Sequence, residues 1–374
     1  MDGVGPMFSS RPLEVLREWE SDPIGVRDLG ESGIVVSDPV LARTVLKSTS
    51  EPFHAESAPF GRVPGWDPGS VENRPVTAAM GRLLDNIARD VDPGRLVELL
   101  EPGGVWPAAV GEMCLQAVVA QLLPGAERRL VVRLSRALAG SAALAHPAGR
   151  RTRWQARLTH SQAMAALYRR TSHNNEPVGI EQVLADALAD NDQVALTLHG
   201  LIGAACRATS VAMAWAVLLK AGWTPTTDVP DRLGFGSEPD PGDPIRESLR
   251  LWPTAWLLHR QVRRPVTLGA HELQPGADVF VCTYLMHRSP AAWKNPLEYQ
   301  PERWIDPPDG YREGYLPFGI GPAACVGSTF VTVLSAKLLS ALTEQGGVQV
   351  RLVDRDPVMG PLCSPPRFTV EHVS

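Results

Sequence analysis

The chain has 374 residues, with 44% hydrophobic and 21% charged side chains, which excludes wholesale disorder. Its net charge of −5 gives no basic footprint for nucleic acid. The most apolar stretch, 196–223, carries His199, Arg207 and Lys220, so no membrane span is expected. There is no signal-peptide pattern at the N-terminus, and the five scattered cysteines form no C-x-x-C pair. These features predict a soluble cytoplasmic protein without structural zinc.

Helical periodicity dominates the first two thirds of the chain. In order, we expect a short helix at 12–20, a hairpin at 24–37, a helix capped by Asp38 at 38–46, a long loop at 52–76 and a mostly helical region at 77–220. The remainder is expected to contain a Pro-rich linker at 224–244, a short helix at 245–252 and strands over 257–286. An irregular loop at 287–324, a helix at 326–343 and a final strand pair around 361–366 follow.

Helices therefore lead and a smaller β region follows, which predicts an α+β fold, mostly α. We expect one domain over 1–374. Its helix-rich part covers about 77–252, and its β-rich parts cover about 22–37, 257–286 and 348–372.

The sharpest motif is the cysteine loop, 318–327, with the sequence Phe-Gly-Ile-Gly-Pro-Ala-Ala-Cys-Val-Gly. Its glycines allow the backbone to fold closely around the sulfur of Cys325. The cysteine also precedes a predicted helix, whose positive dipole end favours a thiolate. An amide-cradled thiolate is a suitable axial ligand for haem iron. A buried cysteine in a glycine-rich turn is the structural alternative.

Two further motifs accompany the loop. Glu247 and Arg250 are three residues apart, which places both charges on one helix face. The second motif is Pro-Glu-Arg-Trp at 301–304. Arg303 and Arg250 flanking a buried Glu247 would form a satisfied charge cluster that fixes the irregular loop.

Together these motifs resemble the cytochrome P-450 family of haem-thiolate monooxygenases, over nearly the whole chain. The resemblance implies a helical prism with a small β-rich side, haem b as cofactor and Cys325 as the iron ligand. It implies a haem-binding role for Arg260, through a propionate, and for the loop residues Phe318, Gly319, Gly321 and Gly327. It also implies a ferredoxin or similar electron donor and a small-molecule substrate.

Several positions depart from the family pattern. Where the family's cysteine loop carries a propionate-binding His or Arg, this chain has Ala323. Two further propionate positions, on the helix after the long loop, align with Met80 and Leu84. Arg82 or His259 is a candidate substitute. Cys363 lies where the family's last hairpin touches substrate.

The central helix also departs from the pattern. The family's acid and alcohol, which relay protons to bound oxygen, align with Arg207 and Ala208, and Thr209 and Ser210 follow. Arg207 could bind a substrate carboxylate, as in the family's fatty-acid peroxygenases. It could instead pair with an internal Asp or Glu. A shifted alignment would make Thr209 or Ser210 the alcohol.

Three hypotheses result. The first is a monooxygenase that uses O2 to tailor a small natural-product intermediate, with proton delivery by Thr209, Ser210, water or substrate. The second is a haem-thiolate enzyme outside the standard oxygen cycle, which uses peroxide or catalyses rearrangement, dehydration or oxidative coupling, with Arg207 binding a substrate carboxylate. The third is a degenerate, non-catalytic member that binds a small molecule.

Overall fold

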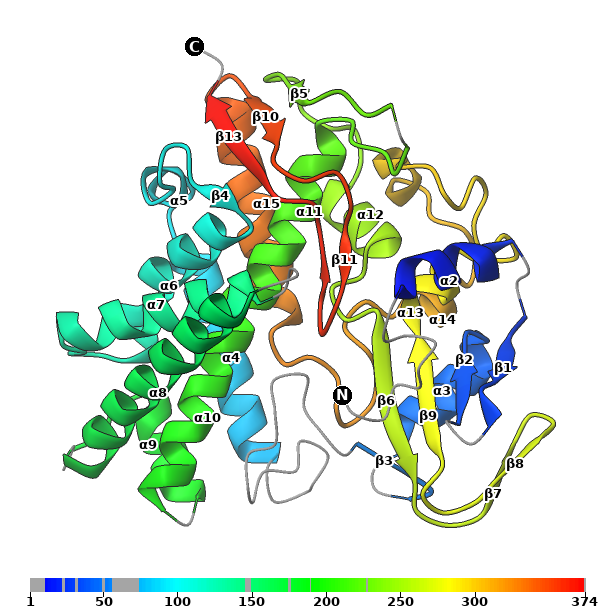
Figure 1. Ribbon diagram of the computed structural model, residues 1–374, viewed down its shortest axis with the longest axis horizontal. Coiled ribbons are helices and arrows are strands. Elements are labelled where there is room, and N and C mark those ends of the chain that lie inside the picture. Colours follow the sequence, from blue (N-terminus) through cyan, green and yellow to red (C-terminus); the bar gives the residue numbers. More distant parts are fainter. Residues whose placement is uncertain are drawn as a thin grey trace.

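The computed structural model describes residues 11–21, 24–30, 33–48, 51–55, 74–144, 149–173, 176–188, 190–226 and 228–372. Helices fill one side of the molecule, and the N-terminal strands and the strands around residue 270 fill the other (Figure 1). This is the mostly α form of the α+β class that the sequence predicts.

The helical side is built from the middle of the chain. Its helices are α4 (Arg74–Asp90), α5 (Pro93–Glu98), α6 (Ala108–Leu122), α7 (Arg128–Ala143), α8 (Arg150–His173) and α9 (Ile180–Ala187). The central helix follows as α10 (Asn191–Gly203), a π-helical turn η2 (Ala204–Ala208) and α11 (Thr209–Lys220). Every side chain of α11 except that of Lys220 is buried, so this helix forms the middle of the core.

Two short helices frame the β side, α2 (Pro12–Glu20) and α3 (Pro39–Lys47). Its main sheet has the strand order β1-β2-β9-β6-β3. These strands are β1 (Val26–Asp28), β2 (Ile34–Val36), β3 (Phe53–His54), β6 (Leu257–Val262) and β9 (Asp278–Cys282). Strand β2 pairs with β9 in parallel, and a separate hairpin joins β7 (Val266–Leu268) to β8 (His271–Leu273).

A second sheet forms near the C-terminus, with the order β4-β13-β10-β5. Its strands are β4 (Val105–Trp106), β5 (Arg232–Phe235), β10 (Val348–Leu352) and β13 (Phe368–His372). A two-stranded pair joins β11 (Val358–Met359) to β12 (Cys363–Ser364). The remaining helices are α12 (Pro244–Leu251), α13 (Thr283–Met286), η3 (Pro301–Trp304), α14 (Tyr311–Gly314) and α15 (Ser328–Glu344).

Several sequence predictions are confirmed. The first helix occupies the expected residues, and the hairpin over 24–37 pairs Val26 with Val36. Asp38 caps α3 by accepting a hydrogen bond from the Leu41 N–H at 2.8 Å. The short helix before residue 252 and the helix after the cysteine loop also form.

Other predictions are wrong in part. The expected loop 52–76 contains strand β3 and the start of α4, and its residues 56–73 lie outside the described part. The linker 224–244 contains β5, which forms because β10 supplies its backbone partners. The strand region 257–286 ends in α13, and the irregular loop 287–324 contains η3 and α14. Strand β4 interrupts the helical region.

The central helix over Asn191–Lys220 is long and apolar enough to cross a membrane by composition. However, 78% of its most apolar window is buried inside the protein, as in the core helix of a globular fold. Trp215 illustrates this burial, since its ring stacks on that of Trp252 with the centroids 4.4 Å apart.

Candidate functional site

The cysteine loop folds back on itself before α15 begins. The Cys325 N–H donates a hydrogen bond to the Phe318 carbonyl at 2.9 Å, which closes the loop. Gly319 and Gly321 have φ angles of +67° and +81°. A Cβ at Gly321 would lie 2.4 Å from the Leu46 carbonyl oxygen, so only glycine fits against the end of α3.

Two other parts of the chain hold this loop. Leu84 of α4 would lie 3.5 Å from a Cβ at Gly327, so α4 packs closely on the turn after the cysteine. The Leu316 N–H donates to His287 Nε2 at 2.9 Å just before the loop. Burial lowers the pKa of His287 to about 3, so this imidazole stays neutral and can accept that bond. The loop is therefore anchored on both sides of Cys325.

Cys325 is the one exposed cysteine of the five, all of which lie in the described part of the chain. Protein atoms around its sulfur disfavour the thiolate and raise the pKa of the thiol, whereas a hydrogen bond from the Gly327 N–H lowers it. The net direction is upward. In the protein chain alone, desolvation therefore outweighs the hydrogen bond from the amide. A bound metal cation would reverse this balance, since coordination deprotonates a thiol.

Cys363 is a poor alternative ligand. It is fully buried in β12, where its Sγ lies 3.4 Å from Met359 Sδ. Its carbonyl accepts a hydrogen bond from Trp215 Nε1 at 2.8 Å, and its N–H donates to the Thr254 carbonyl at 2.9 Å. Burial raises the pKa of its thiol well above the usual range. These contacts describe a structural cysteine in the core.

Arg260 lies on β6 and is buried. The contact found for its guanidinium is a hydrogen bond from Nη1 to the His259 carbonyl at 2.8 Å, and no described carboxylate pairs with it. Burial lowers the pKa of Arg260 to about 10. A buried cation without an anion costs free energy, so this position is prepared for an anionic group from outside the chain.

Arg82 and His259, the candidates for replacing the missing propionate contacts, are not buried free cations like Arg260. Arg82 is exposed on α4, and His259 is bonded through Nε2 to Asp278 Oδ1 at 2.8 Å. Met80 and Leu84 are buried apolar side chains. Among these positions, no described side chain offers a buried cation that could replace the family's missing contacts.

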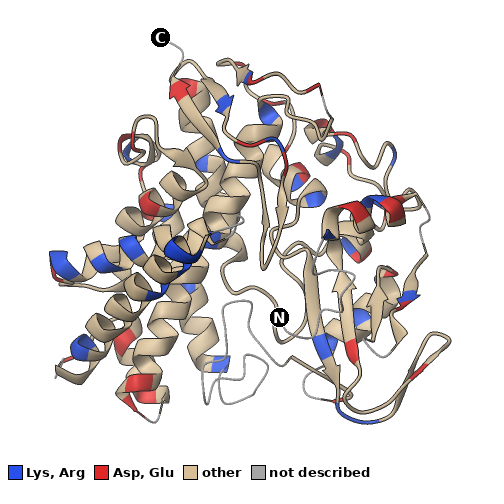
Figure 2. Ribbon diagram, in the orientation of Figure 1, with Lys and Arg blue, Asp and Glu red and all other residues tan. Residues whose placement is uncertain are grey.

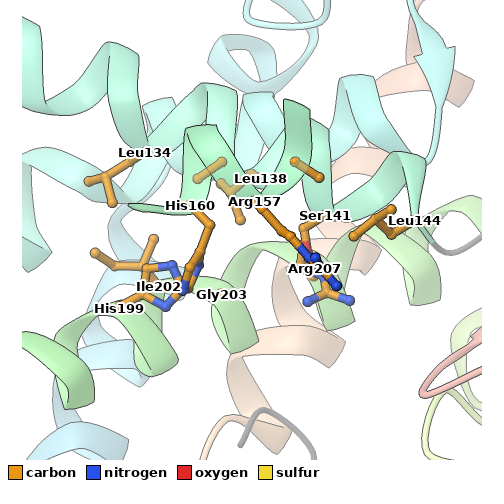
Figure 3. A pocket seen from close by; sticks show the side chains of 12 residues that line it. Leu134, Leu138, Ser141, Leu144, Arg157, His160, His199, Ile202, Gly203 and Arg207 are labelled. Carbon is orange, nitrogen blue, oxygen red and sulfur yellow. The ribbon is translucent and has the colours of Figure 1, made fainter. Parts of the chain in front are cut away.

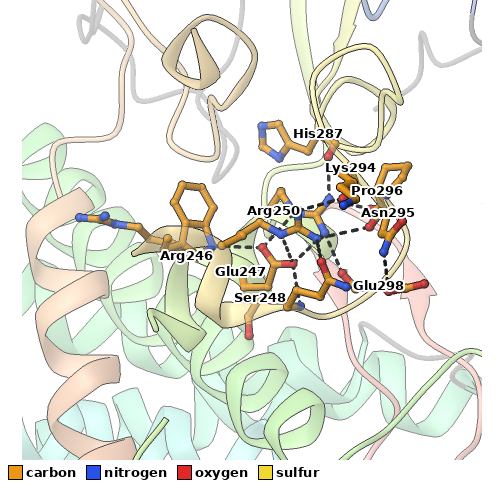
Figure 4. A network of polar contacts seen from close by, with 12 residues as sticks. Arg246, Glu247, Ser248, Arg250, His287, Lys294, Asn295, Pro296 and Glu298 are labelled. Carbon is orange, nitrogen blue, oxygen red and sulfur yellow. Dashed lines mark hydrogen bonds and ion pairs between the residues drawn. The ribbon is translucent and has the colours of Figure 1, made fainter. Parts of the chain in front are cut away.

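Glu247 and Arg250 lie together in one buried cluster (Figure 4), and Arg303 pairs with the same carboxylate at 2.9 Å. The Glu247 carboxylate is fully buried and accepts five hydrogen bonds of 2.8–3.0 Å, from Arg250 Nε and Nη2, Arg303 Nε, the Gln300 N–H and Trp304 Nε1. The Arg250 guanidinium also donates to three main-chain carbonyls, those of His287, Pro296 and Glu298. The cluster therefore ties α12 to the segment that leads toward the cysteine loop.

The central helix widens into the π-helical turn η2 where Arg207 lies. Thr209 is fully buried, and its hydroxyl finds no partner in the described structure. Ser210 donates its hydroxyl proton to the Arg207 carbonyl at 2.9 Å and lies beside Gly111 of α6. Single-turn π-helices are frequent at functional sites. The sequence pattern did not reveal this one.

Arg207 lines a cavity of about 200 Å³ between α7, α8 and the central helix (Figure 3). No ion pair or hydrogen bond joins the Arg207 side chain to another described residue, so the expected internal carboxylate partner is not found there. Burial lowers the pKa of Arg207. Gly203 lines the same cavity, in agreement with the helical spacing of four.

The cavity has a cationic and apolar character that the sequence analysis missed. Its other polar lining residues are Ser141, Arg157, His160 and His199, and the rest are small or aliphatic. The His160 and His199 rings meet edge to face with centroids 4.7 Å apart. Burial, His160 and Arg207 together lower the pKa of His199 to about 4. Because none of the described residues that line the cavity is an acid, it suits an anion with an apolar body.

Comparisons with known proteins agree with this geometry. Residues 243–357 match the family model of cytochrome P450. Cyclooctatin synthase from Streptomyces melanosporofaciens is 37% identical over 100 residues, which are 26% of this chain and 21% of that protein. A probable cytochrome P450 4aa1 from Drosophila melanogaster is 32% identical over 137 residues, which are 30% of this chain and 27% of that protein. The chain thus spans about a sixth to a quarter of the length of the curated relatives that it matches.

Solved structures share the whole fold. The crystal structure of CalO2 has a TM-score of 0.69 at 18% identity and covers 100% of this chain and 98% of its own. A zebra fish cytochrome P450 has a TM-score of 0.69 at 15% identity, with 96% and 98% coverage. The chain therefore has the cytochrome P450 fold, and residues 243–357 carry the sequence pattern of the cytochrome P450 family, whose members bind haem b through a cysteine thiolate.

The residues present fit this cofactor. The matched segment contains Cys325 and Arg260 but ends before Cys363. Cys325 would hold the iron, and the unpaired Arg260 would hold a propionate. The glycine loop leaves no room for a Cβ at Gly321.

We expect Arg260→Leu to weaken haem binding. One charge-assisted hydrogen bond contributes about 1.5–3 kcal/mol, which corresponds to roughly 10- to 150-fold in affinity. The measurement is the rate of haem transfer to apomyoglobin. Arg264→Gln is the control, because Arg264 is exposed and pairs at the surface with Glu51. Equal rates for the two variants would contradict the assignment of Arg260.

Proposed function

We propose that this chain is an O2-dependent haem-thiolate monooxygenase that oxidises a small natural-product intermediate. Haem held by a thiolate supplies the oxygen chemistry, because the thiolate donates electron density that favours O–O cleavage. The observation that carries the proposal is the exposed Cys325 in a closed glycine loop, on a fold that also holds the unpaired Arg260. The relative named cyclooctatin synthase supports a tailoring role.

The proposal includes separate electron donors and a soluble, cytoplasmic setting. The sequence has no nucleotide-binding glycine motif after a strand, so a ferredoxin or similar protein would supply the electrons. Proton delivery would fall to Thr209, whose buried hydroxyl is unpartnered, through an intervening water. Ser210 is less suited, because its hydroxyl already bonds the Arg207 carbonyl.

A second candidate function is favoured by the cavity at Arg207. An unpaired guanidinium in a cavity without acids could hold a substrate carboxylate, which would then serve as the acid–base group in a peroxide-dependent reaction. This function needs no acid–alcohol pair on the central helix, and the chain lacks one.

Turnover with O2 plus a surrogate ferredoxin system, compared with turnover on hydrogen peroxide alone, tests the two functions. For the monooxygenase we expect oxygen-dependent turnover that persists in Arg207→Ala and falls about 10- to 100-fold in Thr209→Ala. Thr197→Ala is the matched control, since that hydroxyl bonds the Gln193 carbonyl within α10. Steady turnover on peroxide alone that disappears in Arg207→Ala would favour the second function.

A further inference from the structure

The helices α7 and α8 carry an extreme local charge. Residues 128–173 contain ten arginines and no Asp or Glu, whereas the rest of the chain has 26 basic and 41 acidic side chains. In Figure 2, blue segments mark the basic residues along these two helices, and red segments mark acidic residues on neighbouring helices. A cationic face on an otherwise acidic protein attracts an anionic partner over a distance of about a Debye length.

These arginines are largely unpaired. In the described structure only Arg170 forms an ion pair, with Glu181. Eight of the ten are exposed, and they form the basic face: Arg128, Arg129, Arg136, Arg150, Arg151, Arg153, Arg157 and Arg169. Arg150, Arg153 and Arg157 repeat at helical spacings of three and four, where like charges repel and destabilise a helix. The face therefore costs stability within this chain, as expected of a surface kept for binding.

The apolar residues of the face indicate a protein partner. Trp154 is 63% exposed in the middle of the arginines, and Leu158 is 41% exposed one turn further on. Trp and Arg are the residues most enriched at the centres of protein interfaces. A membrane-surface helix would present a broad apolar stripe, but the exposed side of α8 is mostly polar.

The position of the basic face next to the cavity indicates what kind of ligand the partner protein would carry. The same two helices wall the cavity that holds Arg207, and Arg157 belongs to both the face and the cavity lining. No residue of the cysteine loop lines that cavity. A partner on this face would thus stand beside the cationic, apolar cavity, and its cargo would be an anion with an apolar body.

We propose that the basic face docks a small acidic carrier protein, which presents its substrate on a phosphodiester-linked arm. The arm supplies the anion, and the tethered acyl or aryl group supplies the apolar body that the cavity suits. The inference of substrate delivery rests on the proposed function, whereas the docking itself does not.

Binding of a purified, octanoyl-loaded acyl carrier protein to the haem-loaded protein tests this proposal by calorimetry. We expect salt-sensitive binding that weakens at least about tenfold in the triple variant Arg150→Gln, Arg151→Gln, Arg153→Gln. The control is Arg95→Gln, Arg264→Gln, Arg351→Gln, which removes the same charge from exposed sites elsewhere and should change affinity less than about twofold. Trp154→Ala should weaken binding without changing the salt dependence.

Three outcomes would overturn the docking. They are no saturable binding of the carrier protein, equal weakening by the two triple variants, and tighter binding of phosphatidylglycerol vesicles or duplex DNA through the same arginines. Because binding is measured without turnover, a docked carrier whose cargo is not oxidised would count against the proposed function and not against the face.

Discussion

Cys325→Ala is expected to abolish the red-shifted Soret band of the ferrous carbon monoxide complex and all oxygen-dependent turnover. On the proposed assignment the Cys325 thiolate would hold the iron directly, so its loss should exceed the roughly 10- to 100-fold cost of losing an outer-shell partner. The variant should still fold, because Cys325 is exposed and contributes little to the core. Absorption spectra of the ferric and ferrous carbon monoxide forms, with circular dichroism for folding, measure this.

Cys363→Ala is the matched control. Its sulfur fills space beside Met359, so its removal should cost about 1 kcal/mol of stability and leave the spectrum unchanged. The reverse result, a normal spectrum in Cys325→Ala and a lost one in Cys363→Ala, would transfer the ligand to the last hairpin. A wild-type protein that purifies without haem and cannot be reconstituted would instead support the degenerate, non-catalytic member.

The sequence could predict the shape of the loop around Cys325, but it could not predict the direction in which the pKa of the thiol shifts. Glycine spacing predicts a tight loop, and the structure contains one with the Cys325 N–H bonded to Phe318. The direction of the thiol pKa depends on how many protein atoms surround the sulfur. Those atoms come partly from distant parts of the chain that pack on the loop, as Leu84 of α4 does beside Gly327. A local motif carries no information about that balance.

The secondary structure likewise contains elements that local sequence signals predict and elements that depend on distant residues. Long periodic helices and capped termini were predictable, since their signals are local. Strand β5 was not, because Arg232–Phe235 becomes a strand through its pairing with β10, more than a hundred residues away. The four-residue helices η3 and α14 are too short to show a period.

Arg207 shows which features of the candidate site could not be predicted from the sequence. Its place on the helix face beside Gly203 follows from spacing. Whether it had an acidic partner could not be known, because that depends on which helices pack against it. The helices that do so, α7 and α8, contain no acid at all, and this was visible in the sequence as a compositional anomaly.

Glu247→Gln is expected to lower the free energy of unfolding by about 3–5 kcal/mol, the cost of breaking a buried ion pair by removing one partner. The substitution keeps the shape of the side chain but leaves Arg250 and Arg303 without their anion. One end of the new amide would also point an N–H at donors that formerly bonded an oxygen. Urea unfolding of the haem-loaded protein, followed by tryptophan fluorescence, measures the change.

Glu98→Gln provides the surface comparison, since Glu98 pairs with Arg95 at 2.8 Å while both side chains are more than 60% exposed. We expect at most about 1 kcal/mol there. A Glu247→Gln protein as stable as Glu98→Gln would show that the cluster does not stabilise the fold.

Replacing Glu247, Arg250 and Arg303 together by methionine separates two contributions. A buried ion cluster exchanged for apolar side chains is often neutral or stabilising, because the desolvation cost disappears with the charges. Here Arg250 and Arg303 also donate to main-chain carbonyls between residues 287 and 298. Those carbonyls would lose their donors, so we expect the triple variant to remain destabilised. The cluster would then act chiefly by fixing the segment that precedes the Cys325 loop, and haem loss should accelerate in parallel.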